Sequence, residues 1–159
     1  MLTDDVADNE YLYRSVRPAD LRTAGGSSFT ITSQAFSDRG LRASVDRAFL
    51  VGYDPDRSRL SPEQAIVVLT AFDARAQGPI EYFSPRPVGY IGVWPPKRFT
   101  VGVSSDPLPI NPAHAVIHLL PFENEDASPF RKLKERLAGI VNAKLEAGEQ
   151  VVILPGSMR

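Results

Sequence analysis

The sequence predicts an α+β fold: a mostly antiparallel sheet with one long C-terminal helix and a few short helices packed on it. Short runs rich in β-branched and aromatic residues recur along the chain, and turns rich in glycine and proline separate them. Residues 128–147 show the apolar repeat of an amphipathic helix. Strands that form one layer, with helices packed on it, give the α+β class.

The composition predicts one ordinary globular domain. Its 159 residues suit a single core, which typically spans ~100–200 residues. The chain is 43% hydrophobic and 23% charged, and its net charge of −1 provides no basic field for nucleic acid or an anionic membrane. The absence of cysteine excludes thiolate nucleophiles and cysteine-based metal sites, and it fits a reducing, cytoplasmic environment.

The N-terminal residues 1–10 predict a flexible acidic arm that precedes a domain at 11–159. They contain no apolar core of a secretory signal. The longest apolar run, residues 65–72, is shorter than the ~20 residues that cross a membrane. We therefore expect no membrane partner.

Three strands are predicted in the first part of the domain, at 11–16, 29–36 and 41–44. Ser44 then resembles an N-cap, with Asp46 in the first turn, where a carboxylate interacts favourably with the helix dipole. This pattern predicts a short helix that Gly52 terminates.

A second helix start is predicted at Ser61, because Pro62 follows it and Gln64 completes a capping box. The run at 65–76 is compatible with helix or strand, and we favour one helical turn followed by a strand. Residues 77–98 predict an insertion rich in proline, glycine and aromatic residues, or a pair of short strands.

The last third predicts strands at 99–105, 113–121 and 150–155, with a long helix between the last two. Ser128 and Pro129 mark the start of that helix. Its apolar stripe consists of Phe130, Leu133, Leu137, Ile140, Val141 and Leu145.

Two histidines, His114 and His118, raise the question of a metal site. On a strand they share a face, but four residues at about 3.3 Å each place them roughly 13 Å apart. That is too far for a common zinc ion, whose bonds to nitrogen measure about 2 Å, so we expect no metal.

His114 is the stronger candidate for chemistry. Asn111 can bond its own backbone in an Asx-type turn and Pro112 restricts φ, so the loop would hold the imidazole rigidly at a strand entrance. A neutral histidine in such a place suits general acid–base catalysis, although it can equally bond a loop carbonyl.

Arg14 shares a strand face with Leu12 and Val16, so we expect it to be half-buried and paired with an anion. That anion is either a carboxylate of this chain, which we favour, or a ligand phosphate. Residues 25–29, which include Ser28, supply small residues and backbone amides that can approach a phosphate, although no P-loop or dinucleotide fingerprint is present.

The order of these motifs resembles the RES-domain family, small bacterial toxins of ADP-ribosyltransferase-like fold that consume NAD. The matching positions are Arg14, Gly25-Gly26, Ser44 and the segment Asn111–His114. The chain departs from the family where Ser-Ser-Phe-Thr replaces the expected Gly-Arg-Trp-Asn, and where only Asp46 stands near the expected helix glutamate.

The resemblance implies one of two functional hypotheses, an enzyme acting on NAD. Arg14 would then bind a phosphate, Ser28 and Asn111 would position the ligand, and His114 or Asp46 would carry the proton chemistry. No further cofactor is expected.

The other hypothesis, which we favour, is a non-enzymatic interaction module in a bacterial defence, toxin–antitoxin or phage-related complex. It rests on the absence of a complete catalytic set and on the aromatic, proline-rich segment 80–96, which suits a protein interface. The residues expected to contact the protein partner are Tyr82, Phe83, Tyr90 and Trp94.

Overall fold

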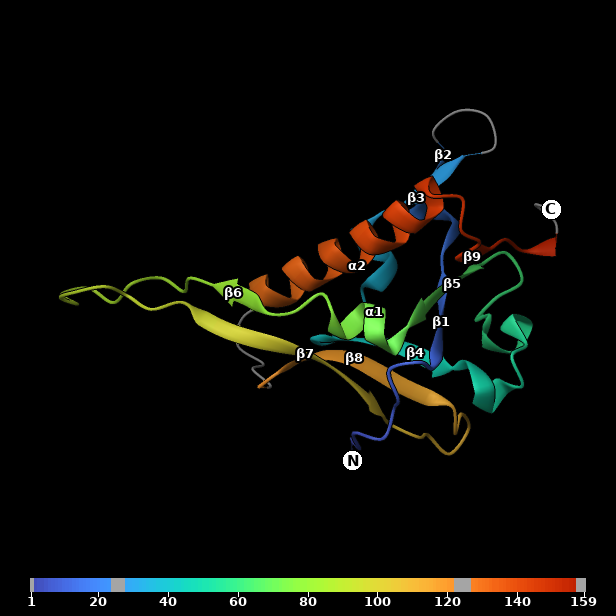
Figure 1. Cartoon of the computed structure of the whole chain (residues 1–159), viewed down its shortest axis with the longest axis horizontal. Helices are drawn as coiled ribbons and strands as arrows, with labels where there is room; N and C mark the ends of the chain where they lie inside the picture. Colours follow the sequence, from blue (N-terminus) through green and yellow to red (C-terminus); the bar gives the residue numbers. More distant parts are fainter. Residues whose placement is uncertain (1, 24–27, 122–126, 157–159) are drawn as a thin grey trace.

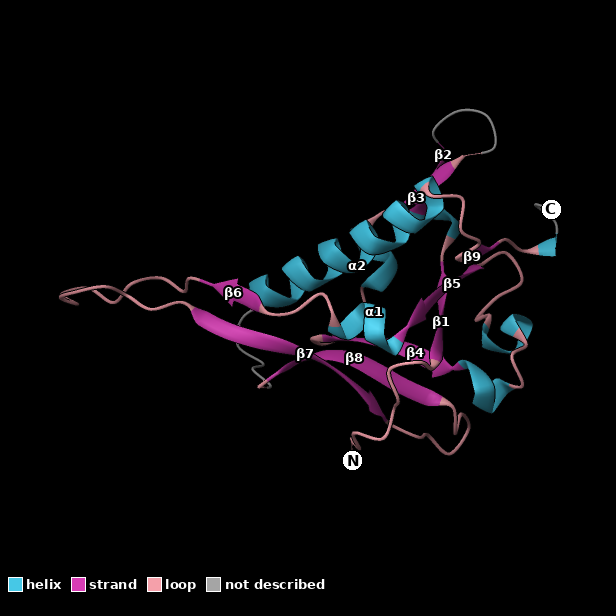
Figure 2. Ribbon diagram, in the orientation of Figure 1, coloured by secondary structure: helices cyan, strands magenta, loops and turns pink. Residues whose placement is uncertain are grey.

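One large sheet runs through the molecule and carries the long helix on one face (Figures 1 and 2). The computed structural model describes residues 2–23, 28–121 and 127–156. The sheet has 7 strands in the order β6-β7-β8-β4-β1-β5-β9, and β2 and β3 form a separate pair. All neighbouring strands are antiparallel. The predicted α+β class, with a mostly antiparallel sheet and one long C-terminal helix, is confirmed.

The strands are β1 (Tyr11–Val16), β2 (Leu21–Thr23), β3 (Phe29–Ile31), β4 (Arg42–Arg47), β5 (Ala65–Thr70), β6 (Ile80–Tyr82), β7 (Lys97–Ser105), β8 (His114–Leu120) and β9 (Val152–Ile153). The α-helices are α1 (Ala71–Arg75) and α2 (Ser128–Glu146). The 3₁₀ helices are η1 (Pro18–Asp20), η2 (Ser33–Phe36), η3 (Ala48–Val51) and η4 (Pro55–Ser58).

The main core lies between α2 and the sheet. The predicted apolar stripe of α2 faces the strands: Phe130, Leu133, Leu137 and Val141 are buried, and Ile140 and Leu145 pack at the margin. Alternate residues of the central strands, such as Ala43 and Val45 of β4, meet them from the sheet. This burial of apolar area is the main force that holds α2 in place.

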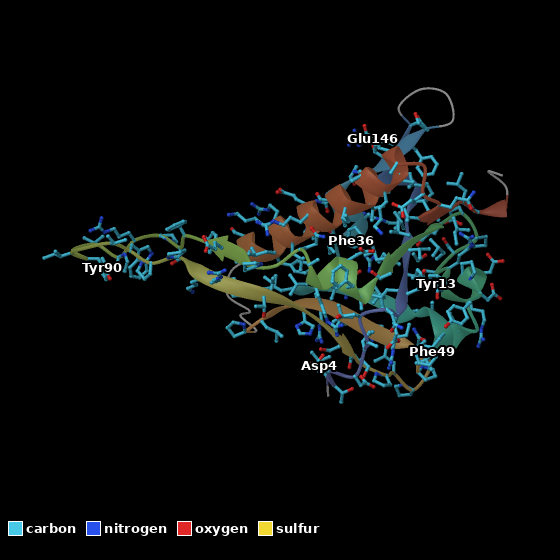
Figure 3. All side chains as sticks on the ribbon, viewed as in Figure 1. Asp4, Tyr13, Phe36, Phe49, Tyr90 and Glu146 are labelled. Atoms are coloured by element: carbon cyan, nitrogen blue, oxygen red, sulfur yellow. The ribbon has the colours of Figure 1, made fainter. Side chains whose placement is uncertain are left out.

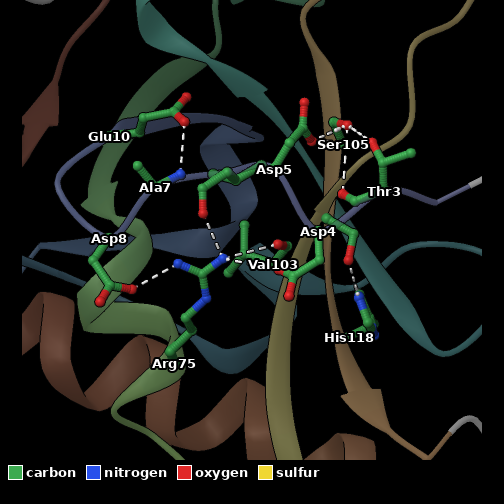
Figure 4. Close-up of polar contacts among 12 residues, drawn as sticks. Thr3, Asp4, Asp5, Ala7, Asp8, Glu10, Arg75, Val103, Ser105 and His118 are labelled. Carbon is green, nitrogen blue, oxygen red and sulfur yellow. Dashed lines mark hydrogen bonds and ion pairs between the residues drawn. The ribbon is translucent and has the colours of Figure 1, made fainter.

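The N-terminal arm lies along the sheet, so the prediction of a flexible arm is wrong for residues 2–10. Thr3 exchanges backbone hydrogen bonds with Ser105 at the end of β7. Val6 is buried in the main core. Arg75 of α1 donates to the Val6 and Val103 carbonyls and pairs with Asp8 (Figure 4). Both apolar burial and charge pairing hold this segment in place.

The predicted helix after Ser44 is wrong, because residues 42–47 form strand β4. β4 pairs with β8 on one side and β1 on the other. Its side chains alternate between the buried core and the opposite face, so a period of two prevails over the local capping pattern. The chain turns helical only at η3, and Gly52 terminates that helix as expected, with a positive φ of 65°.

The helix start predicted at Ser61 is also wrong. Residues 61–64 form a turn, closed by a hydrogen bond from the Gln64 N–H to the Ser61 carbonyl. The prediction for 65–76 of a helical turn followed by a strand is reversed, because the strand comes first, as β5, and the helix follows it as α1. A capping box does exist, but at the far end of β5, where Thr70 and Asp73 cap α1.

The sheet opens between β1 and β4. The two strands pair only at Leu12↔Arg47 and Tyr13↔Asp46, whereas β1 stays bonded to β5 as far as Val16. Continuing the register would set Ser15 against Ser44, but the ladder stops before that pair.

The ion pair between Arg14 and Asp38 provides hydrogen bonds in place of those that β1 does not make to Ser44. The Ser44 carbonyl accepts from Arg14 Nη1 at 2.8 Å, and the Ser44 N–H donates to Asp38 Oδ2 at 2.7 Å. Arg14 and Asp38 bond each other bidentately, at 2.6 and 3.0 Å. The pair therefore satisfies the backbone groups that β1 leaves unpaired and keeps the opening stable.

We predict that Asp38→Asn lowers the free energy of unfolding by about 2–4 kcal/mol, because the Arg14 guanidinium would keep its burial and lose its counter-charge. Urea unfolding at neutral pH measures this. The exposed pair Arg98–Glu81 provides the control, since Glu81→Gln is expected to cost less than about 1 kcal/mol. Equal effects of the two substitutions would contradict the structural role of the pair.

The pH dependence of the wild type gives a second readout of the same pair. Burial raises the pKa of Asp38, but the hydrogen bonds and charge of Arg14 and the Ser44 N–H lower it more, so the pKa lies below its ordinary value of 3.8. The stabilisation is therefore complete above this ordinary value and is lost as the pH falls through the lower pKa of the folded state. Asp38→Asn should remove this part of the acid sensitivity.

Candidate functional site

A cleft of about 410 Å³ lies where β1 and β4 separate. The ends of these strands, the turn after η4 and the loop between β7 and β8 surround it. Its lining residues are Tyr13, Arg14, Ser15, Asp38, Ser44, Val45, Asp46, Ser58, Leu60, Leu108, Ile110, Asn111 and His114. We call it the β1/β4 cleft.

The cleft brings together four of the five residues predicted for the enzyme hypothesis: Arg14, Asp46, Asn111 and His114. They come from three separate segments of the sequence. The fifth, Ser28, precedes β3, is exposed and does not line the cleft, so the expectation that it shares the site is wrong. Gly25 and Gly26 lie outside the described residues.

His114 is anchored through one ring nitrogen. Nδ1 lies 2.9 Å from the Asp106 carbonyl oxygen and 3.5 Å from the Asp106 carboxylate. Because a carbonyl only accepts, Nδ1 carries the proton, and Nε2 of the neutral ring is an acceptor. Among the described residues Nε2 has no partner. The sequence left open whether His114 bonds a loop carbonyl or is available for acid–base chemistry. Both are compatible, because the ring bonds the carbonyl through Nδ1 and still has an acceptor nitrogen, Nε2.

Asn111 and Asp46 form the second polar contact of the cleft. The Asn111 amide donates to Asp46 Oδ1 at 2.8 Å, so its side chain bonds Asp46 rather than forming the predicted Asx turn. Backbone bonds between Asn111 and Leu108 shape the loop instead. Asp46 stands on β4 directly opposite His114 of β8, and its Oδ2 has no partner among the described residues.

Arg14 uses all its donors within the protein. Besides the bonds to Asp38 and Ser44, Nε donates to the Ala35 carbonyl at 2.9 Å and Nη2 to the Ser37 carbonyl at 3.1 Å. A guanidinium has five N–H groups, and these contacts account for all five. The structure thus favours the structural ion pair, because a ligand phosphate would have to displace existing acceptors.

Ser58 was missed by the sequence analysis. It ends η4, is buried and lines the cleft, and its hydroxyl has no hydrogen-bond partner among the described residues. Such groups are uncommon in native proteins and often mark sites that a ligand or water completes. A serine within a proline- and aspartate-rich turn carries no sequence signal for this role.

Two further hollows adjoin the cleft. One, of about 470 Å³, shares Arg14 and Asp38 with it and includes the exposed Arg39. The other, of about 300 Å³, shares Asp46 and Ser58 and includes the exposed Arg57. Unpaired positive charge therefore lies beside the cleft rather than in it.

A second surface is the projecting arm, residues 83–96, which leaves the globular part between β6 and β7 (Figure 1). Of the aromatic residues predicted to bind a partner, Phe83 is exposed, Tyr82 packs against the core, and Tyr90 meets Trp94 edge-on at 4.8 Å. The Trp94 indole N–H donates to the Ser84 carbonyl at 3.0 Å. Trp94 therefore makes contacts within the arm that stabilise its conformation.

The most exposed apolar side chains of the arm are aliphatic, and the sequence analysis did not select them. Val88, Ile91 and Val93 have relative exposures of 106%, 93% and 89%. Arg86 crosses the arm, with a hydrogen bond of 2.6 Å to the Tyr90 carbonyl and its guanidinium 5.7 Å from the Tyr90 ring centre. These contacts restrict the backbone conformation of the arm, on which the aliphatic residues are exposed.

His118 has a structural environment. Its ring is buried, lies against the backbone of Gly102, where an added Cβ would come within 2.7 Å, and contacts the Ser104 hydroxyl at 2.8 Å. Burial lowers its pKa below the ordinary 6.5, the Arg42 charge lowers it further, and the Leu119 carbonyl and Asp4 oppose the change. Asp4 faces the ring in Figure 4.

Comparison of the chain with models of protein families, with curated proteins and with solved structures found no significant match. The resemblance to the RES-domain family therefore remains a hypothesis based on the motifs. No described helix is long and apolar enough to cross a membrane. Within the described ranges, no cluster of three or more candidate side chains is arranged to hold a metal ion.

We predict that His118 makes the fold less stable in mild acid. Because its folded-state pKa is below 6.5, the unfolded chain takes up the proton first, and stability falls as the pH drops through about 6.5 toward the lower pKa of the folded state. His118→Gln should flatten this dependence in denaturant titrations, whereas His114→Gln should leave it in place. An unchanged slope in His118→Gln would contradict the assignment.

Proposed function

We propose that this chain is a protein-interaction module and that its projecting arm docks on a partner protein. The observation that carries the proposal is the exposure of Val88, Ile91 and Val93 on a segment that packs on none of the sheet's faces. Exposed aliphatic groups gain free energy when a partner removes them from water.

The shape of the arm supports the same function. Its proline residues, the Tyr90–Trp94 contact and the Arg86 bonds restrict its conformations before a partner arrives. A preorganised segment loses less conformational entropy on binding than a flexible loop does. We infer a partner with an apolar recess, within a bacterial defence, toxin–antitoxin or phage-related complex.

The proposal is tested by adding charge to the arm. Val88→Asp with Ile91→Asp should abolish co-purification of a partner from the source cells while leaving the melting temperature unchanged, since both residues lie outside the core. The matched control is Tyr53→Asp with Phe72→Asp, which adds the same charge at exposed aromatic residues elsewhere. Identical sets of co-purified proteins for the two double variants, or a wild type that binds nothing and stays monomeric, would refute the proposal.

A second candidate function, consumption of NAD, is favoured by one observation: Arg14, Asp46, Asn111 and His114 meet at one cleft. In this hypothesis His114 Nε2 or Asp46 Oδ2 accepts a proton, because both are available acceptors. The hypothesis requires another phosphate contact than Arg14, and the exposed Arg39 and Arg57 in the adjoining hollows are the available cations.

NAD turnover by the purified protein tests this second function. If it holds, substitution of the group that accepts the proton, by Asp46→Asn or by His114→Gln, should lower turnover about 100-fold or more, the lower end of the range for general acid–base catalysis. Glu135→Gln, on the exposed face of α2, should have no effect. Neither NAD loss nor NAD binding by the wild type at millimolar concentration would exclude the function.

A further inference from the structure

We propose that the β1/β4 cleft binds a small organic cation: an ammonium or guanidinium group carried on an apolar body. This inference concerns the cleft alone and does not depend on the function of the arm. It rests on which hydrogen-bonding groups of the cleft are already used and which are not.

Asp46 and His114 each present an available acceptor atom in the cleft. Asp46 Oδ2 and His114 Nε2 have no partner among the described residues, while Asp46 Oδ1 and His114 Nδ1 are held by Asn111 and Asp106. Asp46 and His114 are direct cross-strand neighbours, and both line the cleft. The Cβ atoms of such neighbours lie about 4.5–5.5 Å apart, so one group with several N–H donors can reach both.

The charge of the cleft points the same way. Its lining contains one cation, Arg14, and two carboxylates, Asp38 and Asp46. Arg14 and Asp38 neutralise each other, so the Asp46 carboxylate is left without a counter-charge. A ligand ammonium supplies that charge, whereas a ligand carboxylate or phosphate would be repelled by Asp46 and would find no free donor on Arg14.

Ser58 is a further polar residue of the lining whose side chain has no internal partner within the described ranges. The residue has a relative exposure of 5%, and its hydroxyl oxygen is covered and has no partner among the described residues. Buried polar groups are normally hydrogen-bonded, and this one belongs to the cleft lining.

Apolar side chains of the lining suit the ligand body. Leu60 and Ile110 are 82% and 95% exposed, although both belong to the lining, and Leu108 joins them. A ligand in the cleft would contact these side chains and reduce their exposure to water. The volume lies in the lower part of the ~300–1,000 Å³ range of small-molecule sites, so we infer a small molecule rather than a protein segment.

The experiment compares three probes of one shape: 2-phenylethylamine, 2-phenylethanol and 3-phenylpropionate. NMR titrations of the wild-type chain at neutral pH measure their affinities. We expect the amine to bind at least about tenfold more tightly than the alcohol, and the carboxylate not to bind. Equal affinity of amine and alcohol, or tighter binding of the carboxylate, would overturn the proposal.

Variants locate the site. Asp46→Asn keeps the side-chain shape and should weaken the amine at least about tenfold, with little effect on the alcohol. Glu135→Gln removes the same charge from the exposed face of α2 and should change neither affinity. If Asp46→Asn does not fold, the three wild-type titrations decide, with the cleft residues identified from their shifted signals.

Two further titrations separate other occupants. A short lysine-containing peptide that binds more tightly than both free lysine amide and the amine would identify a protein side chain as the occupant and overturn the small-molecule proposal. NAD that binds while the amine does not would also overturn it, and would support the second candidate function instead.

Discussion

The ion pair between the buried Arg14 guanidinium and the partly exposed Asp38 carboxylate determines where the central sheet opens. Without it, the edges of β1 and β4 beyond Tyr13 would expose unpaired N–H and C=O groups inside the molecule, which is costly. With it, the carboxylate accepts from the Ser44 N–H and the guanidinium donates to the Ser44 carbonyl, as a neighbouring strand would. The cleft exists because the side chains of Arg14 and Asp38 bond the Ser44 backbone where a neighbouring strand would otherwise pair with it.

The two candidate surfaces lie at opposite ends of the molecule. Figure 3 labels Tyr90 in the arm at one end and Tyr13 and Phe49 at the other, near the strands that border the cleft. Their chemistry also differs, since the arm presents aliphatic groups outward and the cleft presents acceptors inward. A partner that contacts only the arm would leave the cleft open, so the two proposals are physically compatible.

Local patterns in the sequence correctly predicted the elements whose packing in the fold favours the same structure. The alternation at 11–16 and the stripe at 128–147 predicted β1 and α2, because the face selected by the pattern is the face that is buried. The same logic failed at Ser44 and Ser61. Their capping patterns are real but local, and pairing with β8 and β1 in the first case, and burial of β5 in the second, outweighed them.

The site was predictable only in part, for a related reason. His114 and Asn111 were found because proline and asparagine in a loop indicate a restricted backbone conformation. Ser58, Val88 and Ile91 were not found, since nothing in the neighbouring sequence tells a buried hydroxyl without a partner, or a fully exposed valine, from ordinary ones. Those properties arise only when distant segments come together or fail to do so.

The docking of residues 2–10 has a consequence for association between molecules. Beyond the short β6, the outer edge of β7 would offer free backbone groups to another strand. Thr3 occupies those of Ser105, and Arg75 occupies the Val103 carbonyl. An exposed strand edge is a template for intermolecular pairing. The docked N-terminal segment therefore protects this part of the β7 edge against edge-to-edge aggregation.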